Sequence, residues 1–271
     1  MPELPEVETT LRGLEPHLTG QRITDAIIRQ PHLRWEIPRA LPHILRNQTI
    51  RALHRRAKYL LVECDSGMLI LHLGMSGSLR ILPAATPHKV HEHFDLVLEN
   101  DTLMRLRDPR RFGAVLWHAG DPASHPLLAK LGVEPLENGF NADHLHQTLR
   151  TRSIAIKLAI MDSHVVVGVG NIYANEALYR AGIRPQLSAQ KLSRPRCARL
   201  VQAIREVLTE AIALGGSTLR DFVGTDGNAG YFQQHYFVYG RGGEPCRTCA
   251  TPIKHIQQGQ RSSFYCPVCQ K

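Results

Sequence analysis

Two Cys-x-x-Cys pairs near the C-terminal end constrain the fold more than any other feature of the sequence. Cys246 and Cys249 form one pair, Cys266 and Cys269 form the other, and sixteen residues separate them. Each pair can place two thiolates on one face of a tight turn, and two such turns complete a tetrahedral zinc site. Because protein would fill all four coordination positions, the spacing predicts one structural Zn²⁺, with a β-hairpin over residues 252–264.

Disulfide bonds or a thioredoxin-like redox site could also account for these pairs. No run in the sequence approaches the ~18 apolar residues of a membrane span, and we find no charged-then-apolar leader. We therefore expect a cytosolic protein without membrane contact, in which stable disulfides are rare, and we find no βαβ pattern of a redox fold. Cys64, in an apolar strand-like run, and Cys197, in a helical run, are expected to be inert packing residues.

The first half of the chain has the pattern of a β-rich domain that begins with a helix. Apolar side chains recur at helical spacing near the start, at Val7, Leu11, Leu14 and Leu18. Short apolar or alternating runs follow, separated by Gly, Pro, Asn and Asp, as in a β-sandwich or barrel. They occupy residues 23–28, 59–63, 68–73, 94–98 and 114–117. The helix should pack against this domain and hold Pro2 at its rim.

A composition shift near residue 120 introduces a mostly helical second half. The predicted helices cover residues 127–131, 142–149, 154–161, 172–179 and 193–214. The last of them carries a broad apolar stripe that is typical of a buried face. The sequence therefore predicts an α+β chain.

Positive charge indicates a polyanionic partner. The chain carries 33 lysines and arginines against 24 acidic residues, a formal net charge of +9. Basic residues cluster at positions 55–58, 105–111 and 150–152, which favours nucleic acid over an evenly solvated basic surface.

The N-terminal residues carry a possible nucleophile. If Met1 is removed, Pro2 becomes a secondary amine flanked by Glu3 and Glu6, and such an amine can attack a sugar carbon and form an iminium. The simpler explanation is that proline and glutamate only favour the start of a helix. The other motifs decide between these two interpretations.

Two further motifs fit DNA contacts, although each also fits an ordinary turn. The glycines before Asn171 form a tight turn that could present N–H groups to a phosphate at a helix N-terminus. Arg110 and Phe112 lie on one turn and Met75 on another, where an aromatic ring could wedge into a base step and an arginine could hydrogen-bond an unpaired base.

Taken together, these motifs resemble those of bacterial formamidopyrimidine-DNA glycosylases, the base-excision repair family for oxidised purines. The resemblance runs nearly end to end: PELPEVET at 2–9, RAKY at 56–59, HLGMSGS at 72–78, DPRRFG at 108–113, VGVGNIY at 167–173, YGR at 239–241 and the four cysteines. It implies a β-sandwich catalytic domain (1–131), a helix–two-turns–helix DNA-binding domain (132–236) and a zinc finger (237–271). Damaged double-stranded DNA would lie across the cleft between the domains of a monomer.

The resemblance also implies roles for individual residues. Pro2 would be the nucleophile, Glu3 a proton shuttle and Glu6 a supporting residue. Lys58 matches a proton donor in β-elimination, and Arg261 matches an arginine that grips the lesion phosphates and is linked to δ-elimination. The expected DNA contacts are the gap-filling residues Met75, Arg110 and Phe112 and the backbone contacts His91, Arg152, Lys157 and Asn171. Residues 217–231 match the lid over the flipped base, whereas residues 31–47 match no motif and are expected to form a variable loop.

The implied activity is excision of 8-oxoguanine and formamidopyrimidines through a proline Schiff base, followed by β,δ-elimination at the abasic site, in the cytoplasm and nucleoid of a bacterium. One alternative is an endonuclease VIII-type glycosylase for oxidised pyrimidines; Leu4 and the gap-filling set favour the purine branch. Another is a zinc-ribbon DNA-binding protein without catalysis, which would leave Pro2, Glu3 and Lys58 unused.

Overall fold

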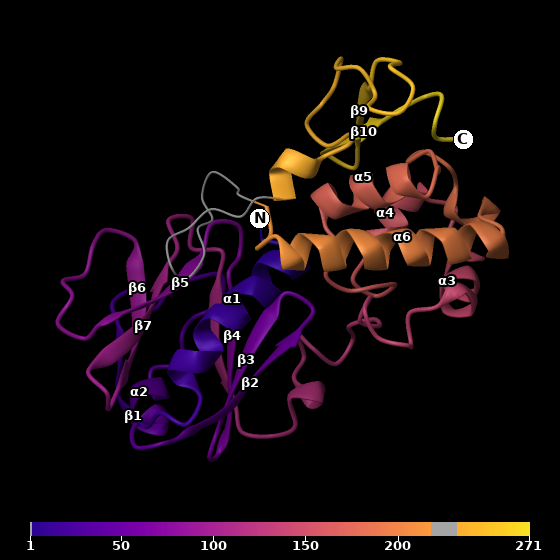
Figure 1. Cartoon of the computed structure of the whole chain (residues 1–271). Coiled ribbons are helices and arrows are strands. Elements are labelled where there is room, and N and C mark those ends of the chain that lie inside the picture. Colours follow the sequence, from indigo (N-terminus) through magenta and orange to yellow (C-terminus); the bar gives the residue numbers. More distant parts are fainter. Residues whose placement is uncertain (1, 218–231) are drawn as a thin grey trace. The chain divides into compact units, whose positions relative to one another are not determined.

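The computed structural model describes residues 2–217 and 232–271, which divide into two compact units (Figure 1). The first unit comprises residues 1–129 with 215–231, and the second comprises residues 130–214 with 232–271. The chain therefore passes from one unit to the other three times.

The first unit contains two four-stranded antiparallel sheets that share one core. The strand orders are β1-β6-β7-β5 and β2-β3-β4-β8. The strands are β1 (Ile23–Ile28), β2 (Ile50–Arg56), β3 (Tyr59–Cys64), β4 (Gly67–His72), β5 (Ser78–Pro83), β6 (Glu92–Leu98), β7 (Thr102–Arg107) and β8 (Ala114–His118). The predicted sandwich, and with it the α+β fold class, is confirmed.

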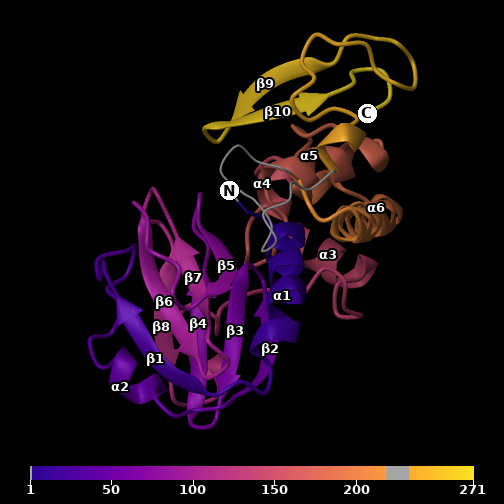
Figure 2. The same cartoon turned by 60° about the vertical axis from the view of Figure 1, so that its left-hand side comes forward.

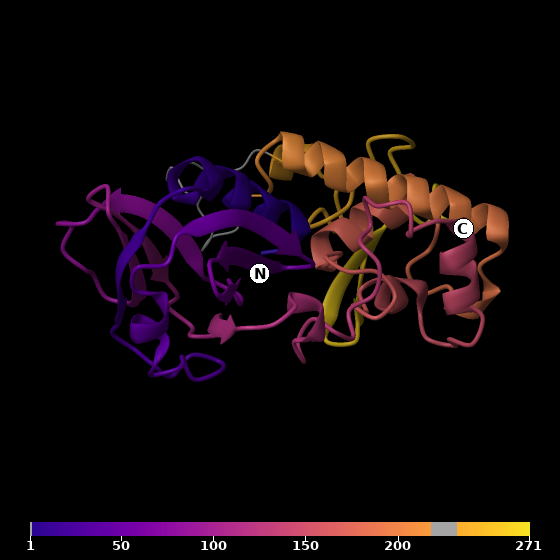
Figure 3. The ribbon, with the colours of Figure 1, turned by 90° about the horizontal axis from the view of Figure 1, so that it is seen from below.

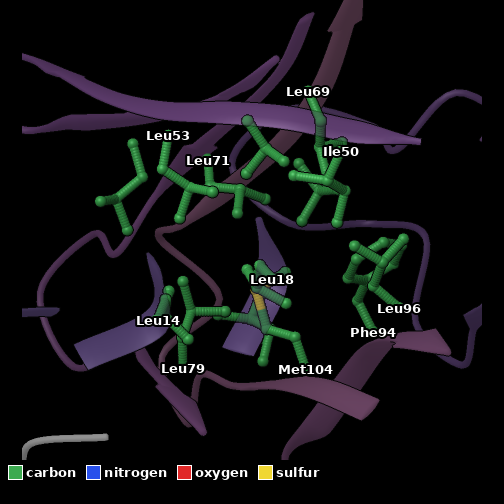
Figure 4. Close-up of a cluster of buried hydrophobic side chains, with 14 of the residues drawn as sticks. Leu14, Leu18, Ile50, Leu53, Leu69, Leu71, Leu79, Phe94, Leu96 and Met104 are labelled. Atoms are coloured by element: carbon green, nitrogen blue, oxygen red, sulfur yellow. The ribbon is translucent and has the colours of Figure 1, made fainter. Parts of the chain in front are cut away.

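Helix α1 (Leu4–Leu18) is held by this core. Its apolar stripe, predicted from the sequence, is buried, and its leucines lie among side chains of both sheets (Figure 4): Leu14, Leu18, Leu53, Leu71, Leu79 and Met104. Burial of each such side chain stabilises the fold by roughly 1.5–3 kcal/mol. The start of α1 is therefore fixed by packing that lies further along the helix.

The second unit is helical and ends in a β-hairpin. Its elements are α3 (Ala142–Leu149), α4 (Ile156–Ile160), α5 (Asn171–Arg180), α6 (Arg194–Ala213), β9 (Lys254–Gln258) and β10 (Arg261–Tyr265). The long helix α6 packs against α5 and α3 (Figure 3). Strands β9 and β10 pair in antiparallel register and form the predicted hairpin (Figure 2). Short 3-10 turns occupy Pro122–Ser124, Ala189–Lys191 and Phe232–His235.

Two local predictions are wrong. Residues 127–131, predicted as a helix, form turns, because this apolar run lies between Pro126 and Gly132 and is too short to propagate a helix. Residues 31–47, expected to be a variable loop, contain helix α2 (Leu41–Leu45). Both of its leucines are fully buried in the sandwich core, so tertiary packing decides its conformation.

One predicted basic cluster is partly structural. Arg105 is only 3% exposed and donates two hydrogen bonds to Asp95, at 2.8 and 2.7 Å, and further bonds to the carbonyls of Thr86 and Pro87. Burial alone would raise the pKa of Asp95, but the guanidinium groups of Arg105 and Arg29 hold it below its usual value. Arg105 therefore stabilises the sandwich and anchors the loop before β6.

Asp95→Ala should destabilise the fold by about 3–5 kcal/mol, because it leaves the buried Arg105 guanidinium without its main counter-charge. The matched control is Glu36→Ala, which removes the exposed Arg39–Glu36 pair and should change stability by less than about 1 kcal/mol. Urea denaturation measures both. Equal effects of the two substitutions would contradict a stabilising role for the buried pair.

Candidate functional site

The N-terminal carboxylates are buried at the start of α1. Glu3 is the N-cap residue and is 3% exposed, and Glu6 is completely buried. The Glu3 N–H donates to Glu6 Oε2 at 2.8 Å, one half of a capping box. Pro2, which immediately precedes this cap, is buried as well. The helix start therefore fixes Pro2 and Glu3 together.

The other oxygen of Glu6 binds a segment from the far end of the unit. The Ser217 N–H donates to Glu6 Oε1 at 2.8 Å, and Gly216 adopts a φ of +79°. A Cβ at Gly216 would lie 3.0 Å from the same Glu6 oxygen, so glycine allows this close approach. Glu6 thus joins α1 to the start of the predicted lid, of which residues 218–231 lie outside the described part of the chain.

Lys58 lies on a two-residue turn between β2 and β3, where Arg56 pairs with Tyr59. Ala57 in this turn has a φ of +55°. Arg55 donates to the Ala57 carbonyl at 3.1 Å and to Glu8 of α1 at 2.8 Å. These bonds couple the Lys58 turn to the helix that carries Pro2, and they show that Arg55, like Arg105, is engaged within the fold.

His72 is a site residue to which the sequence analysis gave no role. It ends β4, its ring lies 4.8 Å from that of Tyr59, and its Nδ1 accepts the Gly74 N–H at 3.0 Å. Burial, together with the charges of Lys58 and Arg34, lowers the pKa of His72 to about 4. The imidazole is therefore neutral at pH 7 and links the Lys58 turn to the turn that carries Met75.

A buried carboxylate holds together the turn that carries Met75 and the turn that carries Arg110 and Phe112. Asp108 is completely buried and accepts hydrogen bonds from Ser76 Oγ at 3.1 Å and from the Gly113 N–H at 2.7 Å. A Cβ at Gly74 would lie 2.4 Å from the Phe112 carbonyl carbon, so only glycine permits this contact. The 74–77 and 108–113 turns therefore form one rigid platform.

Met75, Arg110 and Phe112 belong to this platform, and His91 is hydrogen-bonded to it. Arg110 is exposed, and its guanidinium lies 5.1 Å from the centre of the Phe112 ring, which is 42% exposed. Met75 is half-buried. His91 is exposed, has a φ of +72°, and its carbonyl accepts the Asp108 N–H at 2.9 Å. The structure thus brings these four predicted residues together in the first unit.

In the second unit, polar bonds dock strand β10 onto the helices. Lys157 Nζ donates to the Ser262 carbonyl at 2.7 Å and to Ser263 Oγ at 2.6 Å, and Asn171 Nδ2 donates to the Ser262 carbonyl at 3.1 Å. Arg261 begins β10 and is exposed. Lys157, expected as a DNA contact, is fully buried, and the bonds described here tie α4 to the strand that carries Arg261.

Arg152 is half-buried and forms an ion pair with Asp162 at 2.6 Å. Burial alone would raise the pKa of Asp162, but hydrogen bonds from His164 and Arg152 lower it to about 2. The carboxylate therefore stays ionised and orients the Arg152 guanidinium.

Glu176, which no sequence pattern singles out, anchors residues 237–239. Its buried carboxylate accepts the N–H groups of Phe237, Val238 and Tyr239 at 2.8–3.0 Å. Burial raises the pKa of Glu176, and the three N–H donors oppose this shift. Its only signal in the sequence is its place in the YANE run after Asn171. Residue spacing does not predict that this carboxylate binds three backbone N–H groups of a distant segment.

The four C-terminal cysteines form the predicted metal site. Their Sγ atoms all lie within 4.8 Å of one another, with 3.9 Å between Cys246 and Cys269 and 3.4 Å between Cys249 and Cys266. Zn–S bonds of about 2.3 Å in a tetrahedron require S···S separations close to these values. The donor set fits one structural Zn²⁺ with no open position. By contrast Cys64 and Cys197 are buried, and burial raises their thiol pKa values to about 12 and about 11, so both are inert as predicted.

Three family models match the chain in succession. They are the formamidopyrimidine-DNA glycosylase N-terminal domain at residues 1–115, the formamidopyrimidine-DNA glycosylase H2TH domain at 131–223, and the zinc finger found in FPG and IleRS at 243–271. This order defines a DNA glycosylase that joins a β-sandwich to a helix–two-turns–helix module and a zinc finger. More specifically, the chain belongs to the formamidopyrimidine-DNA glycosylase family.

Individual relatives agree with this assignment. The formamidopyrimidine-DNA glycosylase of Thioalkalivibrio sulfidiphilus is 59% identical over 271 residues, which covers all of both chains. The crystal structure of the MutM (Fpg) protein of Thermus thermophilus matches with a TM-score of 0.89 and 38% identity, covering 99% of this chain and 98% of that one. The Lactococcus lactis Fpg in complex with Fapy-dG containing DNA matches with a TM-score of 0.91 and 33% identity, covering 99% of this chain and all of that one.

In the described parts of the chain, no helix has both the length and the apolar character that crossing a membrane requires.

His72→Gln should flatten the pH dependence of stability between about pH 6.5 and pH 4. The folded-state pKa of His72 is lowered, so the unfolded chain binds a proton first and stability falls as the pH drops through this window. A shift of this size corresponds to a loss on the order of 3 kcal/mol. Urea denaturation of both proteins across the window measures it; His88→Gln, which alters an exposed histidine, should leave the wild-type slope unchanged.

Proposed function

We propose that this chain is a bifunctional DNA glycosylase and abasic-site lyase that removes 8-oxoguanine and formamidopyrimidines from duplex DNA. The observation that carries the proposal is the placement of Pro2 beside the buried Glu3 at a helix start that Glu6 fixes. The Lactococcus lactis Fpg structures support the substrate class, since they are complexes with Fapy-dG containing DNA and with abasic site containing DNA.

The proposed chemistry starts at the amine of Pro2 once Met1 is removed. The nitrogen attacks C1′ of the damaged nucleotide, the C1′–N bond to the base breaks, and the base leaves with a proton. Glu3 relays a second proton, taken up from solvent, to the sugar ring oxygen as the ring opens, which leaves an iminium on C1′. The iminium acidifies C2′–H, so the C3′–O and then the C5′–O bonds break by successive β- and δ-elimination, and water finally releases Pro2.

Two basic residues would assist the eliminations. Lys58 is coupled to α1 through Arg55, and we assign it a proton-donor role in β-elimination. Arg261, at the tip of a hairpin docked by Lys157 and Asn171, would grip the phosphates of the lesion and promote δ-elimination. The zinc ion would act at a distance, by folding the finger that carries Arg261.

The 74–77 and 108–113 turns, which Asp108 holds together, would extrude the base. An enzyme that acts on a base within a duplex must take it out of the stack and fill the gap. Met75, Arg110 and Phe112 would fill it, with Arg110 facing the orphaned cytosine. His91, Arg152 and Asn171 would contact the DNA backbone, and Lys157 would join them only if it leaves its bonds to β10.

The proposal also covers the domain organisation, the oligomeric state and the location of the protein. The domains would be a catalytic sandwich (1–131), a DNA-binding helical domain (132–236) and a zinc finger (237–271). The protein would act as a monomer on damaged double-stranded DNA. Its place would be the bacterial cytoplasm, in association with the nucleoid.

The decisive test is borohydride trapping on a duplex that contains 8-oxoguanine opposite cytosine. Protein shown by mass spectrometry to lack Met1 should give a covalent adduct at Pro2. Protein that retains Met1 holds Pro2 as a tertiary amide, so it should bind damaged DNA yet give almost no adduct and almost no base excision. Pro2→Gly without Met1 should retain some lyase activity on abasic sites, because a primary amine still forms an imine.

Pro5→Ala is the matched control, since it alters the other proline of the same turn and leaves the amine intact; it should trap as wild type does. Robust trapping by protein that retains Met1 would remove Pro2 from the mechanism and make Lys58 the leading candidate nucleophile.

Arg110→Ala should reduce discrimination against bases other than cytosine opposite the lesion, by roughly 1–3 kcal/mol if its base contact is bidentate. Arg111→Ala is the control, because Arg111 is an exposed arginine of the same turn. It should weaken salt-dependent binding while preserving the preference for cytosine. Excision rates opposite each of the four bases give the result. An unchanged preference in Arg110→Ala would make Arg110 a phosphate contact only.

A further inference from the structure

A tyrosine from the helical module touches the zinc site. Tyr179 lies in the last turn of α5, and its hydroxyl oxygen is 3.3 Å from Cys246 Sγ and 2.7 Å from Thr248 Oγ1. Thr248 lies inside the Cys246-x-x-Cys249 turn, and its N–H also donates to Cys246 Sγ at 3.4 Å. These hydrogen bonds therefore connect α5 to the metal site through Cys246.

Zinc coordination fixes the direction of the two hydroxyl hydrogen bonds. A zinc-bound cysteine is a thiolate, which has no proton to donate and can only accept. The single proton of the Tyr179 hydroxyl must then point to Cys246, and its oxygen accepts the proton of the Thr248 hydroxyl. One arrangement satisfies all three groups, a relay from Thr248 to Tyr179 to Cys246.

The hydroxyl of Tyr179 is held in place by rigid neighbours. Its ring stacks on Phe237 with centroids 5.4 Å apart and an interplanar angle of 23°, and the Arg247 guanidinium lies 5.5 Å from the centre of the Phe237 ring. The Phe237 N–H is bound by the buried carboxylate of Glu176 on the same helix as Tyr179. The ring of Tyr179 is thus positioned by its stacking on Phe237, whose backbone is held by Glu176 of the same helix.

We infer that Tyr179 is an outer-sphere residue of the zinc site, and that the relay from Thr248 through Tyr179 controls how long the finger retains its metal. A hydrogen bond from the Tyr179 hydroxyl holds the Cys246 sulfur in the position that zinc coordination requires, so this ligand is less free to leave the metal. Loss of such outer-sphere bonds typically weakens metal binding 10–100-fold. The same bond transmits the position of α5 to the finger.

The test is zinc release from the full chain into excess 4-(2-pyridylazo)resorcinol. Tyr179→Phe keeps the ring stacked on Phe237 and removes only the hydroxyl, and it should release zinc about 10–100-fold faster than wild type. Thr248→Val removes the hydroxyl that orients Tyr179 and should release zinc faster than wild type, by less than Tyr179→Phe does. Thr248→Ser keeps a hydroxyl and should match wild type. Tyr59→Phe, which removes a phenol in the sandwich, is the control.

Cobalt substitution gives a second readout that does not depend on rates. The thiolate-to-cobalt charge-transfer band should shift in Tyr179→Phe and stay at the wild-type position in Thr248→Ser. Wild-type release rates and spectra in Tyr179→Phe would overturn the inference. If Tyr179→Phe loses the finger fold, as judged by circular dichroism, the comparison of Thr248→Val with Thr248→Ser decides, because equal release rates in that pair exclude the relay.

Discussion

A residue at the start of a chain is attached to the protein on one side only, so the position of Pro2 depends on how firmly the first helix is held. In this chain the apolar stripe of α1 is buried in the core of the sandwich, and the carboxylate of Glu6 fixes the first turn. The same carboxylate binds Ser217, more than two hundred residues later in the chain. The start of α1, next to Pro2, is thereby positioned by the sandwich core and by the later segment that contains Ser217.

Buried carboxyl groups hold other turns of the structure in the same way. Asp108 accepts bonds from Ser76 and Gly113 and fixes the Met75 and Phe112 turns relative to each other, and Glu176 accepts three backbone N–H groups ahead of the finger. In each case a buried carboxylate gathers donors from segments distant in sequence. Turns are weakly determined by their own residues, so a carboxyl group with several acceptor sites supplies the rigidity that local hydrogen bonds lack.

The sequence predicts the parts of this structure that periodicity or spacing determines, and it misses those that depend on tertiary contacts. Two Cys-x-x-Cys pairs suffice for the zinc site, and helical spacing suffices for α1 and α6. The short helix α2 has too few residues for a periodic signal and forms because Leu41 and Leu45 reach the core. Likewise nothing in the sequence separates the buried Arg105 from its exposed neighbours Arg110 and Arg111, since the difference lies in Asp95 on the adjacent strand.

The hydrogen-bonding capacity of the side chain explains why these buried groups are carboxylates. A glutamine at position 6 or 176 could accept through one atom only, and its NH₂ group would face a backbone N–H where a second acceptor is needed. Burying a carboxyl group is costly, but two or three N–H donors offset that cost, whereas a donor facing a donor leaves both buried groups unsatisfied. Glu→Gln is therefore not a conservative change at such positions. The requirement is for an acceptor on each of two side-chain oxygens, and of these two side chains only that of glutamate has two oxygens.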